Sequence, residues 1–309
     1  MFELAWREYF HHCWDRLGDA ILSNLRDPPG AGYRDTVPPD LRAAATGVVV
    51  IDQAVHSLYS TGYLHNRARM WLASYAVHLR KVHWRAGADW MIRHLLDGDI
   101  ASNHLSWQWV AGTLTGKPYL FNADNVARYA PAWASAGTVI DRSYQDLEAI
   151  ACGAVDVGPE RHDAVAVDEP PLLTEPPEQF RPDIDRPLPD GPVTLVHPWS
   201  LSPVAGAAVG IVVTDYHGRW PWSALRWRFV LERMRAITQG MLVGASAPLA
   251  AALARRSVTA QDTRNAHYRE LLLQVGAQRS PTPRFFANPP QPCRSFSQFW
   301  HQAHEALPR

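Results

Sequence analysis

Two pairs of polar residues in the first half of the chain have types and spacing that could do chemistry. Asn66 and Arg69 stand one turn apart on a segment that is otherwise largely apolar. A half-buried arginine needs a carboxylate partner, and Asp97 and Asp99, separated by Gly98, are the nearest candidates. Two acids at a helix end are equally typical of a capping turn. This stretch therefore predicts an ion pair that is either structural or part of a site.

Tryptophan is the second unusual feature of the same region. The chain holds 13 Trp residues, and Trp107-Gln108-Trp109 follows the two acids inside a helical pattern. Aromatic residues at helical spacing belong more often to a core than to a cofactor site. The residues by themselves leave both alternatives open.

Helices joined by short loops must position these residues. Apolar spacing predicts helices over residues 2–25, 47–60, 65–81 and 85–96. The second of them should end at Gly62 with a glycine C-cap. Residues 26–46 are rich in proline and glycine, which predicts a long loop. The short connections between the later helices favour their packing as neighbours.

Composition and charge limit the class of protein. The 309 residues are 47% hydrophobic and carry 30 basic and 30 acidic side chains, so the chain can form two domains without a general basic footprint for nucleic acid. The 3 Cys residues lie far apart without metal-ligand spacing, which favours reduced thiols and no metal site. The charged N-terminus indicates neither a secretory signal nor a membrane span, so a cytoplasmic protein is expected.

The pattern changes in the second half of the chain. Residues 154–192 are rich in Pro, Asp and Glu and resemble a linker. Beyond it, short apolar runs alternate with helical segments, which predicts a parallel α/β sheet. The runs lie at residues 193–196, 208–213, 241–244 and 258–260. We therefore expect a helical domain over 1–153, a linker over 154–192 and an α/β domain over 193–309.

One predicted helix of the second half carries a group of arginines. The group comprises Arg226, Arg228, Arg233 and Arg235. These side chains could meet phosphates or the acidic linker, or simply form a solvated face. The same half holds no dinucleotide-binding fingerprint.

Several separated motifs in register resemble the flavin-binding helical lobe of the photolyase and cryptochrome family. They are Glu3–Tyr9, Thr61–Met70, His83–Gly87, Asp97–Asn103 and Trp107–Trp109. The resemblance covers about residues 2–130. It implies an α-helical FAD-binding domain, followed here by the small α/β domain. That second domain weakly resembles the family's antenna domain, placed after the flavin lobe instead of before it.

The resemblance implies FAD in a U-shaped conformation inside the helical lobe. Carried over by motif match, its neighbours would be Asn66, Arg69, Asp97, Asp99 and Asn103. Arg69 and Asp97 would pair beside the flavin ring, and the amide of Asn103 would lie near its N5 atom. An asparagine at position 103 resembles photolyases more than animal or plant cryptochromes.

The implied chemistry is light-driven electron transfer from reduced flavin to a cyclobutane pyrimidine dimer flipped out of DNA. The positions that contact this lesion would be Glu3, Trp6, Asn66, Met70 and Trp109. The His-His pair associated with repair of (6-4) photoproducts is absent, since Asn66 follows His65. The dimer is therefore the expected substrate, and UV-damaged DNA the expected partner.

Photoreduction in the family uses a chain of tryptophans. Trp107 matches the member next to the flavin and Trp84 matches the middle one. Residues 15–60 contain no Trp for the distal position, and Tyr33, in the predicted loop, is the other redox-active aromatic before Tyr59. The resemblance thus implies a truncated or rerouted electron path.

The expected flavin site lacks its phosphate side. The Ser/Thr-rich helices that hold the FAD phosphates in the family are not found ahead of Glu3, and charge-assisted hydrogen bonds contribute about 1.5–3 kcal/mol each. FAD would then bind weakly, or a homo- or hetero-oligomeric partner or another part of the chain would complete the site. The alternatives to repair are a cryptochrome-like blue-light photosensor and a flavin-free regulatory subunit.

Overall fold

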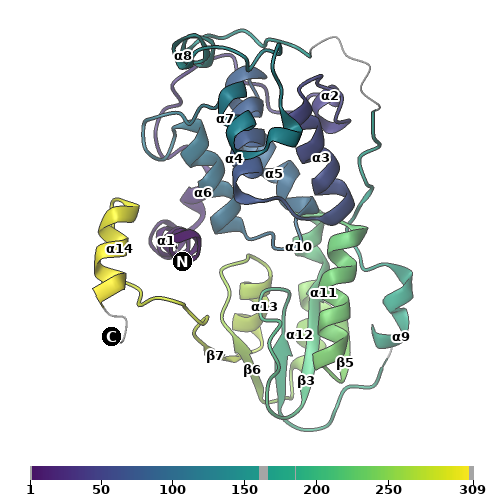
Figure 1. Ribbon diagram of the computed structural model, residues 1–309. Helices are drawn as coiled ribbons and strands as arrows, with labels where there is room; N and C mark the ends of the chain where they lie inside the picture. Colours follow the sequence, from purple (N-terminus) through teal and green to yellow (C-terminus); the bar gives the residue numbers. More distant parts are fainter. Residues whose placement is uncertain (1, 160–165, 185, 306–309) are drawn as a thin grey trace. The chain divides into compact units, whose positions relative to one another are not determined.

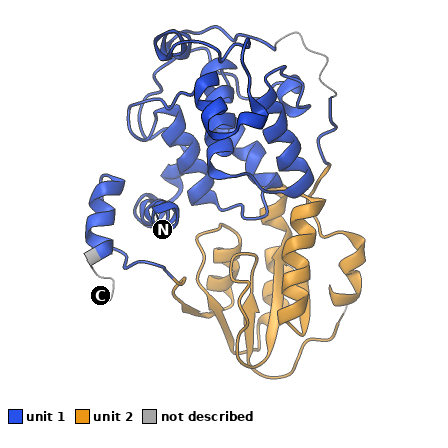
Figure 2. Cartoon of the chain, in the orientation of Figure 1, with its two compact units in different colours: residues 1–170, 284–309 blue, residues 171–283 orange. Residues whose placement is uncertain are grey.

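The chain folds into two compact units in the computed structural model, which describes residues 2–159, 166–184 and 186–305 (Figure 1). Unit 1 comprises residues 1–170 and 284–309, and unit 2 comprises residues 171–283 (Figure 2). Unit 1 is helical and unit 2 contains a parallel sheet, which confirms the expected fold class.

Unit 1 is built from helices of the first half of the chain and one helix from its C-terminal end. Their bounds are α1 (Phe2–Leu17), η1 (Gly18–Leu22), α2 (Pro39–Arg42), α3 (Val49–Thr61), α4 (Asn66–Ser74), η2 (Tyr75–Leu79), α5 (Trp84–His94), α6 (Ile100–Ala111), α7 (Ala123–Tyr129), η3 (Pro131–Trp133), α8 (Tyr144–Cys152) and α14 (Phe296–Glu305). The predicted first helix is shorter than expected, since Gly18 has a φ of 56° and the chain continues as a 3-10 turn. The glycine cap is confirmed: Gly62 has a φ of 66° and donates its N–H to the carbonyl of Leu58.

Helix α6 forms the centre of unit 1. It packs against α1, α4 and α5, and most of its residues are buried (Figure 1). A helix that is buried on nearly every face has to be surrounded by other elements. Consequently the residues of α6 are placed next to side chains from three other helices, which is the condition for an enclosed site.

Unit 2 contains a five-stranded parallel sheet with the order β5-β3-β2-β6-β7. Its strands are β2 (Val193–Val196), β3 (Ala208–Val213), β5 (Gly240–Gly244), β6 (Val258–Gln261) and β7 (Gln278–Ser280). The connecting helices are α10 (Thr214–Arg219), α11 (Ala224–Ile237), α12 (Ser246–Leu253) and α13 (Tyr268–Gln274). Strand β7 was not predicted, because all three of its residues are exposed and it carries no apolar run. The short segments β1 (Leu172–Leu173) and β4 (Trp222–Ser223) form a separate antiparallel pair.

The boundaries of the units differ from the expected domains at both ends of the α/β domain. The first part of the expected linker is attached to unit 1, because Asp156 bonds to Arg80 and Glu169 bonds to Arg42. The second part belongs to unit 2. It contains β1, η4 (Glu178–Phe180) and α9 (Arg181–Ile184), and Asp183 of α9 lies 2.6 Å from Arg235. Residues 160–165 and 185 of that linker lie outside the described residues. Residues 284–305 pack with unit 1 instead of with the sheet.

The arginines of α11 have different surroundings from one another. Arg226 is 3% exposed and lies over the ring of Trp222, at 4.1 Å from its centroid. Arg233 donates to the carbonyl of Leu201, and Arg235 pairs with Asp183 in the acidic segment. The sequence left phosphates, the acidic linker and a solvated face open as surroundings for these arginines. Arg235 contacts the acidic linker.

Candidate functional site

A cavity of about 570 Å³ in unit 1 brings together residues from α1, α4, the end of α5 and α6. This volume lies within the usual range for small-molecule sites. The predicted site residues that line it are Glu3, Trp6, Asn66, Arg69, Met70, Asp97, Asp99, Asn103, Trp107 and Trp109. Trp84 is the predicted site residue that does not line it. Residues separated by up to about a hundred positions thus meet around one space.

Arg69 and Asp97 form a bidentate ion pair on the cavity wall. The Nη2 atom of Arg69 lies 3.0 and 2.9 Å from the two carboxylate oxygens of Asp97. The Nε atom of the same arginine donates to the carbonyl of Leu64 at 2.8 Å, which fixes the guanidinium plane. Asp97 is the more exposed partner, at 56%. Of the two candidate carboxylates, Asp97 is thus the partner of this arginine.

Asp99 has different partners. It is the N-cap of α6, where its Oδ1 accepts the backbone N–H of Ser102 at 2.8 Å, and His11 Nε2 lies 3.1 Å from the same oxygen. Burial raises the pKa of Asp99, but His11, the Ser102 amide and Arg7 outweigh it, so the pKa lies well below its usual value. The cavity therefore contains a carboxylate that stays ionised, positioned by a helix N-terminus.

Asn103 lines the cavity and carries one polar atom that has no partner in the described part of the chain. Its side-chain nitrogen donates to the carbonyl of Ala88 at 2.9 Å, which determines the orientation of the amide. The oxygen Oδ1 is buried and has no hydrogen-bond partner among the described residues. The same holds for Nε1 of Trp107 and Oγ of Ser102, both also on cavity-lining residues. Buried polar atoms are nearly always paired, so these atoms fit a polar ligand held in the cavity.

Trp6 on α1 and Trp109 on α6 form part of the aromatic wall of the cavity. Their ring centroids are 6.3 Å apart with planes at 65°. Asn66 Nδ2 lies 3.5 Å from Glu3 Oε1 on the rim, at the limit of a hydrogen bond. Two indoles, a carboxylate and an amide are thus exposed to one space, a combination that can hold a flat heterocycle by its face and its edges.

Trp107 and Trp84 lie deep in the helical unit, at 1% and 2% exposure. Trp84 begins α5 and its Nε1 donates to Asn24, while Trp107 on α6 packs directly against Gly87 of α5. The His83 ring is 5.7 Å from that of Trp84, and Tyr33 is 6.4 Å from His83. Tyr33, expected as a loop aromatic, is therefore half-buried near Trp84.

Several cavity residues were missed by the sequence analysis. Arg7 and Phe10 lie on the same face of α1 as Glu3 and Trp6, at the spacing of successive helical turns, so that periodicity could have indicated them. His11, the partner of Asp99, had no signal of this kind, because the two residues are far apart in the sequence.

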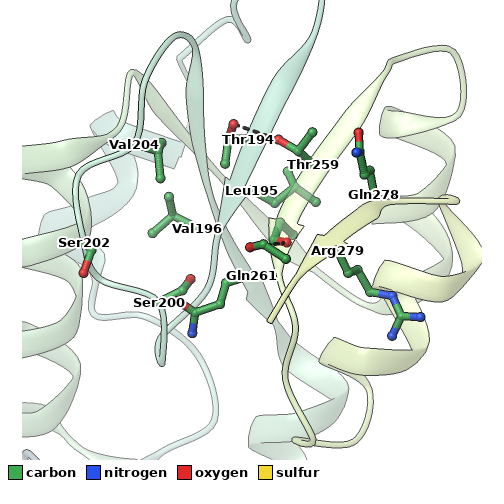
Figure 3. A pocket seen from close by; sticks show the side chains of 12 residues that line it. Thr194, Leu195, Val196, Ser200, Ser202, Val204, Thr259, Gln261, Gln278 and Arg279 are labelled. Carbon is green, nitrogen blue, oxygen red and sulfur yellow. Dashed lines mark hydrogen bonds between the residues drawn. The ribbon is translucent and has the colours of Figure 1, made fainter. Parts of the chain in front are cut away.

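A second cavity, of about 340 Å³, lies on the sheet of unit 2 (Figure 3). Thr194 and Thr259 share a hydrogen bond of 2.9 Å across neighbouring strands, and Arg279 is paired with Asp262 at 3.0 Å. Polar side chains at alternate strand positions cover this face, where residues 197–207 form a loop in place of a crossover helix. Because these groups bond to one another, we assign no ligand to this cavity.

Metal-ligating groups and membrane-spanning helices are both absent from the described residues. In residues 2–159, 166–184 and 186–305, no group of three or more His, Cys, Asp or Glu side chains is placed to hold a metal ion. No helix in these same ranges combines the length and the apolar character that a membrane span requires.

The family model for the FAD binding domain of DNA photolyase matches residues 1–156. The chain is 39% identical over 114 residues to a deoxyribodipyrimidine photo-lyase of Streptomyces griseus, a match that covers 37% of this chain and 25% of that protein. It is 37% identical over 131 residues to the Escherichia coli deoxyribodipyrimidine photo-lyase, with 39% and 27% covered. A cryptochrome DASH of Gloeobacter violaceus is 34% identical over 115 residues, with 36% and 23% covered.

These matches concern the helical unit and its cavity. The chain spans about a quarter of the length of these curated relatives. The matched residues contain α1 to α8, and therefore every residue that lines the cavity of unit 1. The chain belongs to the photolyase/cryptochrome family, and residues 1–156 are its FAD-binding domain.

Proposed function

We propose that this protein binds FAD in the cavity of unit 1 and uses light-driven electron transfer to repair cyclobutane pyrimidine dimers in DNA. The observation that carries the proposal is the convergence on one cavity of the residues expected to contact flavin and those expected to contact the lesion. Bound FAD would supply the light absorption and the transferred electron. The residues of this chain would bind, orient and shield it.

The polar residues would hold the flavin. Arg69 and Asp97 present a fixed ion pair at the wall, and Asp99 presents an ionised carboxylate. The unpartnered Oδ1 of Asn103 can only accept a hydrogen bond, so it favours a flavin that carries a proton at the facing nitrogen. These features support a site adapted to reduced flavin.

The wall of Trp6 and Trp109, together with Glu3, Asn66 and Met70, would hold the lesion. Stacking on aromatic faces and hydrogen bonding to base edges are how proteins bind an extruded base. Trp107, packed between the cavity and α5, would pass an electron to the flavin, and Trp84 would supply Trp107. Both indoles are shielded from water, which keeps such a path free of side reactions.

The test uses the purified 309-residue chain loaded with FAD and an oligonucleotide that contains one cyclobutane thymine dimer. Illumination under reducing conditions should convert the dimer to two thymines, and the dark sample should not change. The variant Trp107→Phe should slow the light-driven reduction of the flavin. Colourless protein that takes up no added FAD, or yellow protein without light-dependent loss of dimers, would refute the repair proposal.

A photosensor is the second candidate function. The net charge is zero, and a DNA-binding protein usually has an excess of positive charge. A cryptochrome-like protein would keep the flavin and the tryptophans without the lesion. Reversible light-driven reduction with no preference for damaged over undamaged DNA would favour this candidate.

The proposal must also account for the groups that bind the FAD phosphates. The basic side chains that line the cavity are Arg7, His65 and Arg69, and Arg69 is already paired with Asp97. We therefore propose that a second copy of this chain or a different partner chain contributes to holding the FAD phosphates. Sedimentation with and without FAD tests the second copy: a mass that corresponds to one chain and does not change on FAD binding would exclude it. A flavin-free regulatory subunit is the remaining alternative, which FAD titration decides.

A further inference from the structure

The chain returns to unit 1 after completing the sheet, and its last segment binds α1. We call residues 284–305 the C-terminal clasp; they have the colour of unit 1 in Figure 2. Arg284 lies 3.3 Å from the buried carboxylate of Glu8 and 2.5 Å from that of Asp15. Both partners lie on α1, on the helix that also carries Glu3 and Trp6 of the cavity.

A buried histidine joins the middle of the clasp to α1. His12, at 1% exposure, lies with Nδ1 2.7 Å from Oδ1 of Asn288, and its Nε2 accepts the backbone N–H of Cys293 at 3.0 Å. These two contacts require a neutral ring with the proton on Nδ1. Burial lowers the pKa of His12, which agrees with that state. The clasp is thus held to α1 by specific bonds as well as by apolar contact.

The aromatic part of the clasp contacts a cavity residue directly. Phe296 stacks on Trp6 with ring centroids 4.0 Å apart and planes at 7°. Phe299, at 1% exposure, fills the space beside Tyr9, and α14 packs against α1 (Figure 1). No described residue of the clasp lines the cavity, so Phe296 acts on the cavity only through Trp6.

The stack determines the plane of the Trp6 ring. Its other close aromatic neighbours are tilted or edge-on: Tyr9 at 78°, Trp109 at 65° and Phe10 at 43°. Edge contacts tolerate rotation of the indole, whereas a parallel ring at stacking distance opposes it. Trp6 is itself only half-buried, so without that ring its side chain would be free to reorient.

We propose that Phe296 is a positioning residue that holds the plane of Trp6, so that this indole presents a preformed flat wall to a planar base or ring in the cavity. The inference rests on the proposed function for the identity of the ligand. The orientation of Trp6 depends on its contact with Phe296 and not on the identity of the ligand. Preformed walls bind more tightly because less conformational freedom is lost on binding.

The first test measures the orientation of the Trp6 ring and needs no assay of enzymatic activity. The 309-residue chain is labelled with 5-fluorotryptophan and compared as wild type, Phe296→Leu, Phe296→Tyr and Phe286→Leu. The variant Trp6→Phe assigns the Trp6 resonance. Leucine keeps an apolar cover over α1 but removes the flat face, and Phe286 contacts Trp300, not Trp6. The ¹⁹F resonance of Trp6 should broaden or split only in Phe296→Leu. A line as narrow as that of wild type in this variant would overturn the inference.

The second test measures the consequence for the ligand. Phe296→Leu should bind an oligonucleotide with one thymine dimer about tenfold more weakly, a change typical of one weakened aromatic stack. Its FAD content and its rate constant for the bound dimer should equal those of wild type, and Phe296→Tyr should restore the affinity. Equal dimer affinity in wild type and Phe296→Leu would overturn the inference. If wild type itself shows no preference for the dimer, the repair proposal fails and the fluorine resonance alone decides the inference.

Discussion

Asn103, which lines the cavity, donates its amide nitrogen to the carbonyl of Ala88 at 2.9 Å, and its buried oxygen Oδ1 has no hydrogen-bond partner among the described residues. This relationship predicts how Asn103→Ala will behave. The variant removes the acceptor, so reduced FAD should bind about fivefold more weakly, the effect of one hydrogen bond of about 1 kcal/mol, while oxidised FAD is less affected. Titrations of both redox forms under anaerobic conditions measure the difference.

A matched control is Ser106→Ala, which shortens another side chain of the cavity wall. It should change the affinity for the two forms equally. If Asn103→Ala also weakens both forms by the same factor, the selective role of Oδ1 is wrong.

Arg69→Lys tests the bidentate pair with Asp97. Lysine keeps the charge but loses the bond from Nε to Leu64, which fixes the guanidinium whose Nη2 contacts both oxygens of Asp97. We expect about tenfold weaker FAD binding with an unfolding free energy changed by less than about 1 kcal/mol, because Asp97 is largely exposed. Fluorescence titration with FAD and urea unfolding give the two numbers.

The control for this variant is Arg142→Lys, since Arg142 is exposed and outside the cavity. Unchanged FAD affinity in Arg69→Lys would show that the Arg69–Asp97 ion pair has only a structural role, which is to hold the loop that follows α5. A double-mutant cycle with Asp97→Asn separates the coupling between the two residues from their separate effects.

Much of the cavity could be predicted because its residues lie in short motifs with strong local spacing. Asn66 and Arg69 occupy one helix, and Asp97 to Asn103 form one cap and the first turn of α6. The spacing of residues along the sequence indicates which of them share a face of one helix. That Trp6 of α1 meets Trp109 of α6 is a property of helix packing, and it was expected from the family resemblance rather than from the periodicity.

The contacts that could not be predicted are long-range and involve residues without a motif. His11 meets Asp99, and Arg284 meets Glu8, across separations at which a sequence pattern carries no pairing information. The apolar residues Phe296, Phe299 and Trp300 follow a helical period, which indicates that the last helix needs a partner. It did not indicate that the partner is α1 and not the sheet that precedes it in the chain.

Gly87→Ala tests the close packing of α5 on Trp107. A methyl group at position 87 would lie 2.2 Å from Cζ3 and 2.4 Å from Cη2 of this ring, so the indole would have to shift. Overpacking of this kind costs about 1–3 kcal/mol of the unfolding free energy. Displacement of the ring should also slow light-driven flavin reduction, as in Trp107→Phe. Urea unfolding and transient absorption measure the two effects.

Two comparisons make this result specific. Gly153→Ala introduces a methyl group at ordinary contact distance and should stay within about 0.5 kcal/mol of wild type. The double variant Gly87→Ala with Trp107→Phe should recover part of the lost stability, because the smaller ring leaves room for the methyl group. Strict additivity of the two losses would contradict a direct clash.

His78 predicts a pH dependence of stability. This residue is 0% exposed, its Nε2 lies 2.9 Å from the carbonyl of Val110, and burial lowers its pKa to about 4. The unfolded chain binds a proton near pH 6.5, whereas the folded chain does so only near pH 4, so the unfolded state takes up more protons between these values. The contribution of His78 is therefore fully present above pH 6.5 and is lost as the pH falls toward 4.

The shift corresponds to about 3 kcal/mol of unfolding free energy. His78→Gln can keep a hydrogen bond to Val110 but does not titrate, so its stability should fall less between pH 6.5 and 4 than that of wild type. Urea unfolding of both proteins across this interval gives the comparison, and His304→Gln, an exposed histidine in α14, should follow wild type. Glutamine cannot take up a proton in this pH range. If the unfolding free energies of wild type and His78→Gln fall in parallel with pH, protonation of His78 is therefore not what destabilises the helical unit.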